Sequence, residues 1–290
     1  MKKLQIGRWR AGPRRDGATA FNLAAFFTGT EESIYAIWKA IESHGHRINC
    51  LISMPRATQH GAWLHHNPDI DLIKVQADAL GLPLIELHLK DSLKPHELEA
   101  ALKQAKINYG IEGITAGIFK EHGYEQKLLT DLCDVLKLRI VDPICKRDRV
   151  ALLKELISAG FKIAIVQIDH SALDRSWIGL NLDRVVLDKL IELTCAGASL
   201  GSEGSYSFFV FDGPIYRQAI DFSECDVRME GPHSGAIRVH KVKLIAKEAF
   251  LKRHVYWERQ AGTHFFDKAF GLSRCKRAVR HKGRHAGRRG

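Results

Sequence analysis

No uninterrupted apolar stretch in this sequence approaches the roughly 18–20 residues that a membrane-spanning helix needs, so we expect no membrane contact. The six cysteines are scattered and include no Cys-x-x-Cys pair, which argues against a zinc ribbon and against a disulfide framework. Reduced thiols in a cytoplasmic protein are the simplest account. What the chain has is an ordinary globular mixture, with 45% hydrophobic and 27% charged residues, enough to build a core.

The positive charge is confined to the two ends of the chain. The formal net charge is +11, yet residues 1–20 hold six basic and one acidic side chain, and residues 252–290 hold twelve and two. About −4 therefore remains for residues 21–251. We expect a basic extension at 1–20 and a basic tail at 251–290. Such a tail can bind nucleic-acid phosphates, but a solvated tail is the more usual outcome.

Strand and helix patterns alternate over residues 21–144, which is typical of a parallel sheet covered by helices. The predicted strands are 21–27, 48–54, 84–89, 111–116 and 140–143. The predicted helices are one that follows the turn at 28–33 and ends at Gly45, and those at 72–80, 95–105 and 125–136. The regular alternation then ends, and the predicted elements are helices at 150–159 and 182–194 and strands at 162–168, 206–211 and 237–245. We predict an α/β domain over 21–147 and a smaller α+β domain over 148–250.

The turn Thr28-Gly-Thr-Glu-Glu-Ser33 joins the first strand to the first helix. Backbone N–H groups and the helix dipole converge at such a turn and suit a phosphate, while Gly29 permits close approach. Neither the Gly-x-Gly-x-x-Gly fingerprint nor the usual phosphate loop fits this segment. A plainer interpretation is that Thr28 or Thr30 only caps the helix.

The order of segments over about residues 22–216 resembles the diphthine–ammonia ligase family, within the PP-loop (N-type ATP pyrophosphatase) superfamily. The family's Ser-Gly-Gly-Lys-Asp-Ser falls on residues 28–33, and its Phe-His-x-Pro-Asn-Ile resembles His65-His-Asn-Pro-Asp-Ile70. The segments QADALGLPLI (76–85), GITAGIFKEHGYEQKLLTDLCDVLKLRIVDPICKRD (113–148) and LISAGFKIAIVQID (156–169) are also similar. The family's Gly-Glu-Gly-Gly-Glu-Phe falls on residues 201–206, before Asp212-Gly-Pro214.

This resemblance implies a HUP-like nucleotide-binding domain that uses ATP and Mg²⁺ to activate a carboxylate, and ammonia to convert it to an amide. It implies elongation factor 2 as the protein substrate. The expected roles are catalytic for Glu32 and Glu203, with Glu32 also a metal ligand. Expected nucleotide contacts are Thr28, Gly29, Thr30, Glu31, Ser33 and Gly117, and expected substrate contacts are His66, Gly201, Ser202, Gly204 and Ser205.

The chain departs from the family's pattern at both motifs. Glu31 stands where the family has lysine, so we expect an anion to face and repel the polyphosphate. Ser202 and Ser205 stand where the family has glutamate. A paralogue that binds ATP or AMP without catalysis is therefore the alternative.

Overall fold

The computed structural model describes residues 19–53, 71–87, 94–116, 123–144, 148–194 and 206–249. Its first half is built on five parallel strands in the order β3-β2-β1-β4-β5. The strands are β1 Asn22–Phe27, β2 Arg47–Ser53, β3 Leu84–Glu86, β4 Gly113–Thr115 and β5 Arg139–Val141, and the helices between them are α1 Glu31–His44, α2 Leu72–Leu80, α3 Pro95–Tyr109 and α4 Gly123–Leu136.

Alternate residues of β1 pack on opposite faces of this sheet. Leu23, Ala25 and Phe27 share a core with α1 and α2, whereas Ala24 and Phe26 share a second core with α3 and α4. The helices thus cover both faces, and strand β1 lies at the centre. Because the chain moves outward from β1 to β2 and β3, then returns on the other side to β4, the strand order reverses between β1 and β4.

Local signals in the sequence fix where the helices begin and end. Helix α1 ends at Gly45, whose φ of 64° is left-handed and favours glycine. Helix α2 begins after Asp71, whose side chain accepts a hydrogen bond from Lys74 N. Asp148 caps helix α5, Arg149–Ser158, in the same way.

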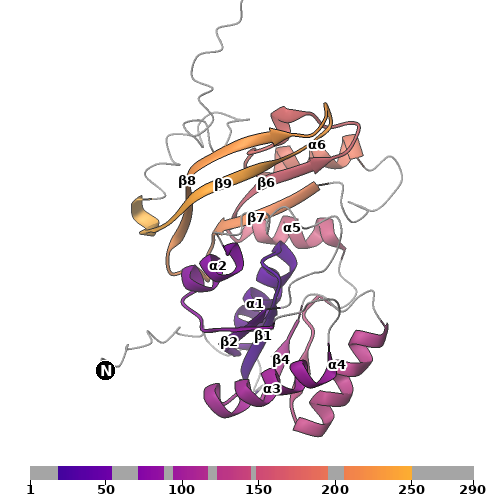
Figure 1. Ribbon diagram of the computed structural model, residues 1–290, viewed down its shortest axis with the longest axis vertical. Helices are drawn as coiled ribbons and strands as arrows, with labels where there is room; N and C mark the ends of the chain where they lie inside the picture. The colour runs from indigo at the N-terminus through magenta and orange to yellow at the C-terminus, as the bar shows by residue number, and fades with distance from the viewer. Residues whose placement is uncertain are drawn as a thin grey trace, which may run out of the picture.

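The second half is an antiparallel sheet in the order β7-β6-β9-β8. Its elements are α5 Arg149–Ser158, β6 Lys162–Asp169, a short 3₁₀ turn at Arg175–Trp177, α6 Arg184–Thr194, β7 Tyr206–Asp212, β8 Ala219–Met229 and β9 Ser234–Ile245. The two sheets lie one above the other, with α1, α2 and α5 at the level between them (Figure 1).

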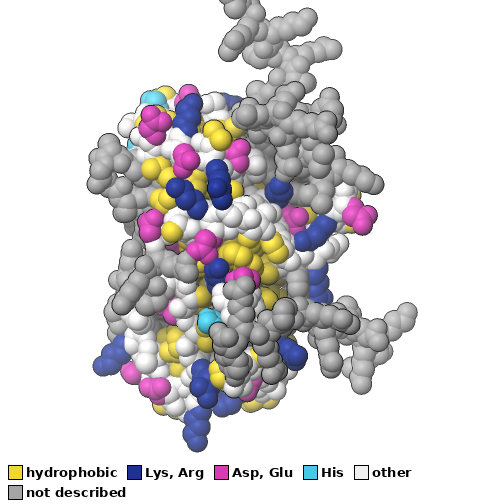
Figure 2. Space-filling model, turned by 180° about the vertical axis from the view of Figure 1, so that it is seen from behind, with side chains coloured by type: hydrophobic (Ala, Val, Ile, Leu, Met, Phe, Trp, Pro, Cys, Tyr) yellow, Lys and Arg dark blue, Asp and Glu magenta, His cyan; other side chains and the backbone are white. Residues whose placement is uncertain are grey.

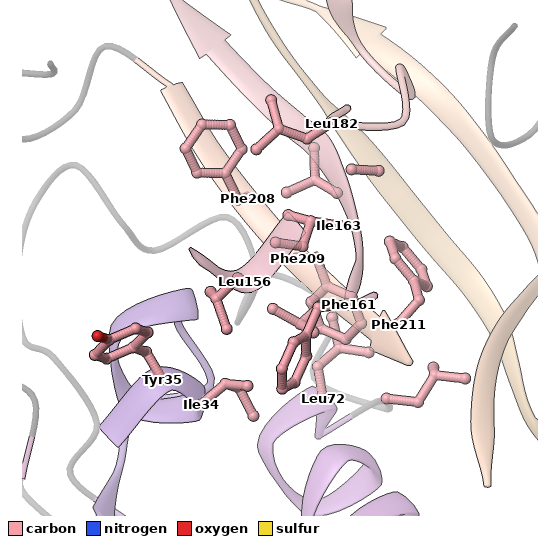
Figure 3. Packing of buried hydrophobic residues seen from close by; sticks show 14 of the residues in the cluster. Ile34, Tyr35, Leu72, Leu156, Phe161, Ile163, Leu182, Phe208, Phe209 and Phe211 are labelled. Carbon is pink, nitrogen blue, oxygen red and sulfur yellow. The ribbon is translucent and has the colours of Figure 1, made fainter. Parts of the chain in front are cut away.

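One apolar core joins the two halves. Side chains from α1, α2 and α5 point toward those from β6 and β7, so the seam between the halves is filled (Figure 3). Ile34, Leu72, Leu156 and Phe209 belong to this cluster and are at most 5% exposed. The nucleotide-binding half expected from the sequence is therefore packed against the second half along the helices that follow β1 and β2.

The predicted fold class, a parallel sheet with flanking helices and a smaller α+β part, is confirmed. Helix α2 has the predicted bounds, while α3 runs four residues further and β3 and β4 are shorter than predicted. Strand β8 was not predicted. Among the described residues, no helix is both long and apolar enough to cross a membrane.

Charged side chains of both signs are interspersed over the face shown in Figure 2, with no patch of one sign. This distribution agrees with the small net charge expected for residues 21–251. The two basic ends lie almost entirely outside the described residues.

Candidate active site

The turn between β1 and α1 is held by hydrogen bonds among its own residues. The Thr28 and Thr30 hydroxyl oxygens lie 2.9 Å apart, and Ser33 Oγ donates to the Thr30 carbonyl oxygen over 2.8 Å. Thr30 is the residue that precedes the helix, but its side chain makes no capping hydrogen bond. Side-chain capping by Thr30, one of the two caps that the plainer interpretation allowed, is therefore wrong. The Ser33 hydroxyl proton serves the turn itself, so its predicted contact with a nucleotide stays a prediction.

A buried glutamine of α2 makes a hydrogen bond to the backbone of this turn. Gln76 is 1% exposed, and its Nε2 donates to the carbonyl oxygens of Gly29, at 3.2 Å, and Val210, at 3.4 Å. Gly29 has a φ of 76°, and a Cβ on it would lie 2.6 Å from Gln76 Oε1. One side chain thus ties the turn after β1 to strand β7 of the second half.

The turn lies at the carboxyl end of β1, beside the point where the strand order reverses. In open α/β sheets, ligands bind in the crevice outside the carboxyl ends of the strands at such a switch point. Strand β4 ends there too: Thr115 pairs with Ala25 in parallel register and lies on the sheet face that α1 covers. Its Oγ1 is buried and has no hydrogen-bond partner within the part of the chain that the structure describes.

Glu31, the first residue of α1, makes an ion pair with Arg149, the first residue of α5. Arg149 donates from Nε over 2.9 Å and from Nη2 over 2.6 Å to the same oxygen, Glu31 Oε1. The Glu31 side chain is 3% exposed and that of Arg149 is 24% exposed. The expectation of an uncompensated anion at this position is therefore corrected: α5 brings a cation to it from 118 positions away.

Two aromatic rings of β7 complete the surroundings of Arg149. Its guanidinium carbon lies 5.7 Å from the ring centre of Tyr206 and 5.3 Å from that of Phe208, within the range of cation–π attraction. Burial alone would lower the pKa of Arg149. The carboxylates of Glu31 and Glu32, together with Tyr206, outweigh that effect and raise the pKa overall, so Arg149 stays charged.

Three segments approach one another at Arg149, of which only the glycine turn was predicted as part of the site. These are the glycine turn, the start of α5 and the start of β7, whose first residue directly follows the predicted substrate-binding segment. Several predicted site residues lie outside the described residues: His66, Gly117, Gly201, Ser202, Glu203, Gly204 and Ser205.

Comparison with known proteins assigns both halves of the chain to one family. Models described as the diphthamide synthase N-terminal domain and C-terminal domain match residues 21–140 and 148–245. The chain belongs to the diphthamide synthase family. A human diphthine–ammonia ligase is 25% identical over 252 residues, which cover 79% of this chain and 90% of that protein. A Danio rerio diphthine–ammonia ligase is 22% identical over 226 residues, 68% and 85% of the two chains.

Solved structures add little to this assignment. A glycinamide ribonucleotide transformylase 1 from Geobacillus kaustophilus aligns over 85% of this chain and 97% of that one, with 13% identity and a TM-score of 0.29. A likeness this low carries no argument about function.

For this diphthamide synthase family member, sequence reasoning missed Arg149 and the role of Gln76. One signal for Arg149 was present: a cation in the first turn of a helix is disfavoured by the helix dipole unless a partner holds it there. Its neighbour Asp148 was expected to begin the second domain, but nothing in the sequence pointed to Glu31 as the partner. Gln76 was noticed only as part of a family-like segment.

Proposed function

We propose that this chain is a diphthine–ammonia ligase. In this reaction a carboxylate of the acceptor attacks the α-phosphorus of ATP, pyrophosphate leaves, and ammonia displaces AMP from the acyl-adenylate to give an amide. The observation that carries the proposal is the match to both domains of the family in one chain, over 90% of the human ligase's length. The identity of 22–25% to two diphthine–ammonia ligases extends over most of the chain, and it supports the reaction class more strongly than any single residue does.

The geometry supports a nucleotide at the carboxyl end of β1. The left-handed Gly29 turn and the first turn of α1 direct backbone N–H groups toward one place, which suits the polyphosphate. We place the adenosine near β4 and residue Gly117, on the other side of the strand-order reversal. Residues 201–205, the predicted acceptor side, directly precede β7, whose first residue Tyr206 lies beside Arg149. Holding both reactants in one orientation accounts for much of the rate gain in such reactions.

We propose that Glu32 contributes to a Mg²⁺ site. Among the described residues, no group of three or more His, Cys, Asp or Glu side chains is arranged to hold a metal ion. The single carboxylate of Glu32 suits Mg²⁺ that arrives with the nucleotide, because Mg²⁺ commonly uses one or two carboxylates together with phosphate oxygens and water. The ion would neutralise phosphate charge beside two glutamates. Glu203 stays a proposed catalytic residue.

The remaining assignments follow the family resemblance. We propose elongation factor 2 carrying diphthine as the acceptor, a cytoplasmic location, and a PP-loop or HUP type of nucleotide domain over residues 21–147, with the acceptor side in 148–250. The basic segments 1–20 and 251–290 are proposed to lie outside the catalytic unit.

The test is a ligation assay with purified protein, ATP, Mg²⁺, an ammonium salt and diphthine-bearing elongation factor 2. We expect pyrophosphate and AMP release that depends on the acceptor, together with an acceptor mass change corresponding to amide formation. Binding of ATP without acceptor-dependent pyrophosphate release would favour the nucleotide-binding paralogue. Absence of any ATP binding would contradict both.

A further inference from the structure

Arg149 occupies a position that stability alone does not explain. A buried ion pair often stabilises a fold no more than apolar side chains of similar volume would. The seam between α1 and α5 already has an apolar core and a second ion pair, Lys39 Nζ to Glu155 Oε2 at 2.9 Å. Placing a cation at the positive end of α5 is unfavourable in itself.

The local charges show what Arg149 does for the turn. Glu31 and Glu32 put two negative charges on the first turn of α1, where a polyphosphate would bind, and Arg149 returns one positive charge. The family sequence that this chain resembles has lysine at the position of Glu31. The cation at this turn therefore comes from α5 rather than from α1, and it arrives through contact with the side chain that replaces the lysine.

The hydrogen bonds to Glu31 use only part of the donor capacity of the Arg149 guanidinium. Both hydrogen bonds to Glu31 use Nε and Nη2 and end on a single carboxylate oxygen. Arginine has five N–H donors, and the Arg149 side chain is 24% exposed while Glu31 is 3% exposed. The rings of Tyr206 and Phe208 fix the guanidinium in position. The guanidinium thus lies beside the first turn of α1, with N–H donors that Glu31 does not use.

We propose that Arg149 is the phosphate-binding cation of this site, its guanidinium shared between Glu31 and the β- and γ-phosphates of ATP. Glu31 positions the arginine and, as an anion, competes with the nucleotide for it. The inference rests on the proposed function, because it needs ATP to bind at the glycine turn. It adds the residue that recognises the polyphosphate.

The test compares MgATP and AMP affinities of single variants by calorimetric titration. Arg149→Gln removes the cation and should weaken MgATP binding by about 10- to 100-fold, the usual scale for a hydrogen bond to a charged group. Glu31→Gln keeps an oxygen to accept from Arg149 but removes the competing charge, so it should strengthen MgATP binding by about 3- to 10-fold. AMP lacks the β- and γ-phosphates, and its affinity should change little in either variant.

The opposite directions of the two expected changes in MgATP affinity distinguish a role in ligand binding from a structural role. Lys39→Gln and Glu155→Gln, the matched changes in the other α1–α5 ion pair, should leave both affinities unchanged. If Arg149→Gln and Glu31→Gln both weaken MgATP binding, or neither changes it, the inference is overturned while the ligase proposal stands. Should Arg149→Gln fail to fold, Glu31→Gln still decides, since MgATP binding that is unchanged or weaker in this variant overturns the inference and stronger MgATP binding with unchanged AMP binding supports it. Wild-type protein that binds no ATP would overturn both proposals.

Discussion

Gly29 meets two constraints at once, a left-handed backbone and a close neighbour. Its φ is 76°, and a Cβ would lie 2.6 Å from Gln76 Oε1. We expect Gly29→Ala to lower the free energy of unfolding by more than the roughly 1–2 kcal/mol that left-handed strain alone costs, and to weaken MgATP binding. Urea denaturation measures the first effect.

Gly110→Ala is the matched control, since Gly110 has a φ of 62° and no atom within 4 Å of an added Cβ. It should show the strain without the collision. Equal losses in the two variants would mean that Gln76 yields without cost.

His46 makes stability depend on pH. Phe21 N donates to His46 Nδ1 over 3.1 Å, so that nitrogen must be unprotonated, and burial, helped by nearby His44, lowers the pKa of His46 below its ordinary 6.5. The unfolded chain therefore takes up the proton more readily than the folded one. The stabilisation that neutral His46 contributes to the folded state is complete above pH 6.5 and is lost as the pH falls through the lowered pKa of His46.

His46→Gln should remove that dependence. We expect the stability difference between wild type and variant to be larger at about pH 8 than at about pH 5, measured by urea denaturation at both values. Carboxylates that titrate in this range are common to both proteins and cancel in the difference. Parallel pH profiles would contradict the assignment.

At this scale the sequence indicated the glycine turn but not its partners. Residue types and spacing around Gly29 were enough to suggest a phosphate site. The pairing of Glu31 with Arg149 spans 118 positions, and the bond from Gln76 to Val210 spans 134, so only the folded chain brings them together. The charge expected to repel phosphate is balanced for that reason.

At the scale of elements, α2 joins three parts of the chain through Gln76. We expect Gln76→Leu to cost about 1–3 kcal/mol of unfolding free energy, because the buried carbonyl oxygens of Gly29 and Val210 would lose a donor. MgATP affinity should fall with it. Gln104→Leu, at an exposed position of α3, is the control and should change stability by less than about 0.5 kcal/mol. A neutral Gln76→Leu would show that the turn holds without α2.

Regular elements with a strong pattern were predictable, and β8 was not. Helix α2 shows why: an apolar stripe, an aspartate cap and a following glycine all agree. Strand β8 has the opposite character. It lies at the edge of the antiparallel sheet, its pairing with β9 is irregular between Phe222 and Cys225, and Glu224 and Asp226 are poor strand formers. Its stability comes from pairing with β9, which the sequence does not display.

At the scale of the whole molecule, the shared core predicts one unfolding transition. Residues of α1 and α2 pack with residues of α5, β6 and β7, so neither half keeps its apolar surface covered alone. We expect calorimetry of the full chain to give a single peak with a van't Hoff enthalpy close to the calorimetric one. Two separate peaks would show that the halves are independent, as the sequence-based division at residue 148 would suggest.

The filled seam also bears on how substrates enter. Parting the two sheets like jaws would expose the rings of Tyr35, Phe161 and Phe209 to water, at about 25 cal/mol for each Å² of apolar surface. A rigid-body movement that opens and closes the two halves around ATP would therefore cost much free energy. Local rearrangement at the carboxyl end of β1 and β4 costs much less. We therefore expect substrate entry and product release to depend on small movements at the carboxyl ends of β1 and β4, while the rest of the molecule stays rigid.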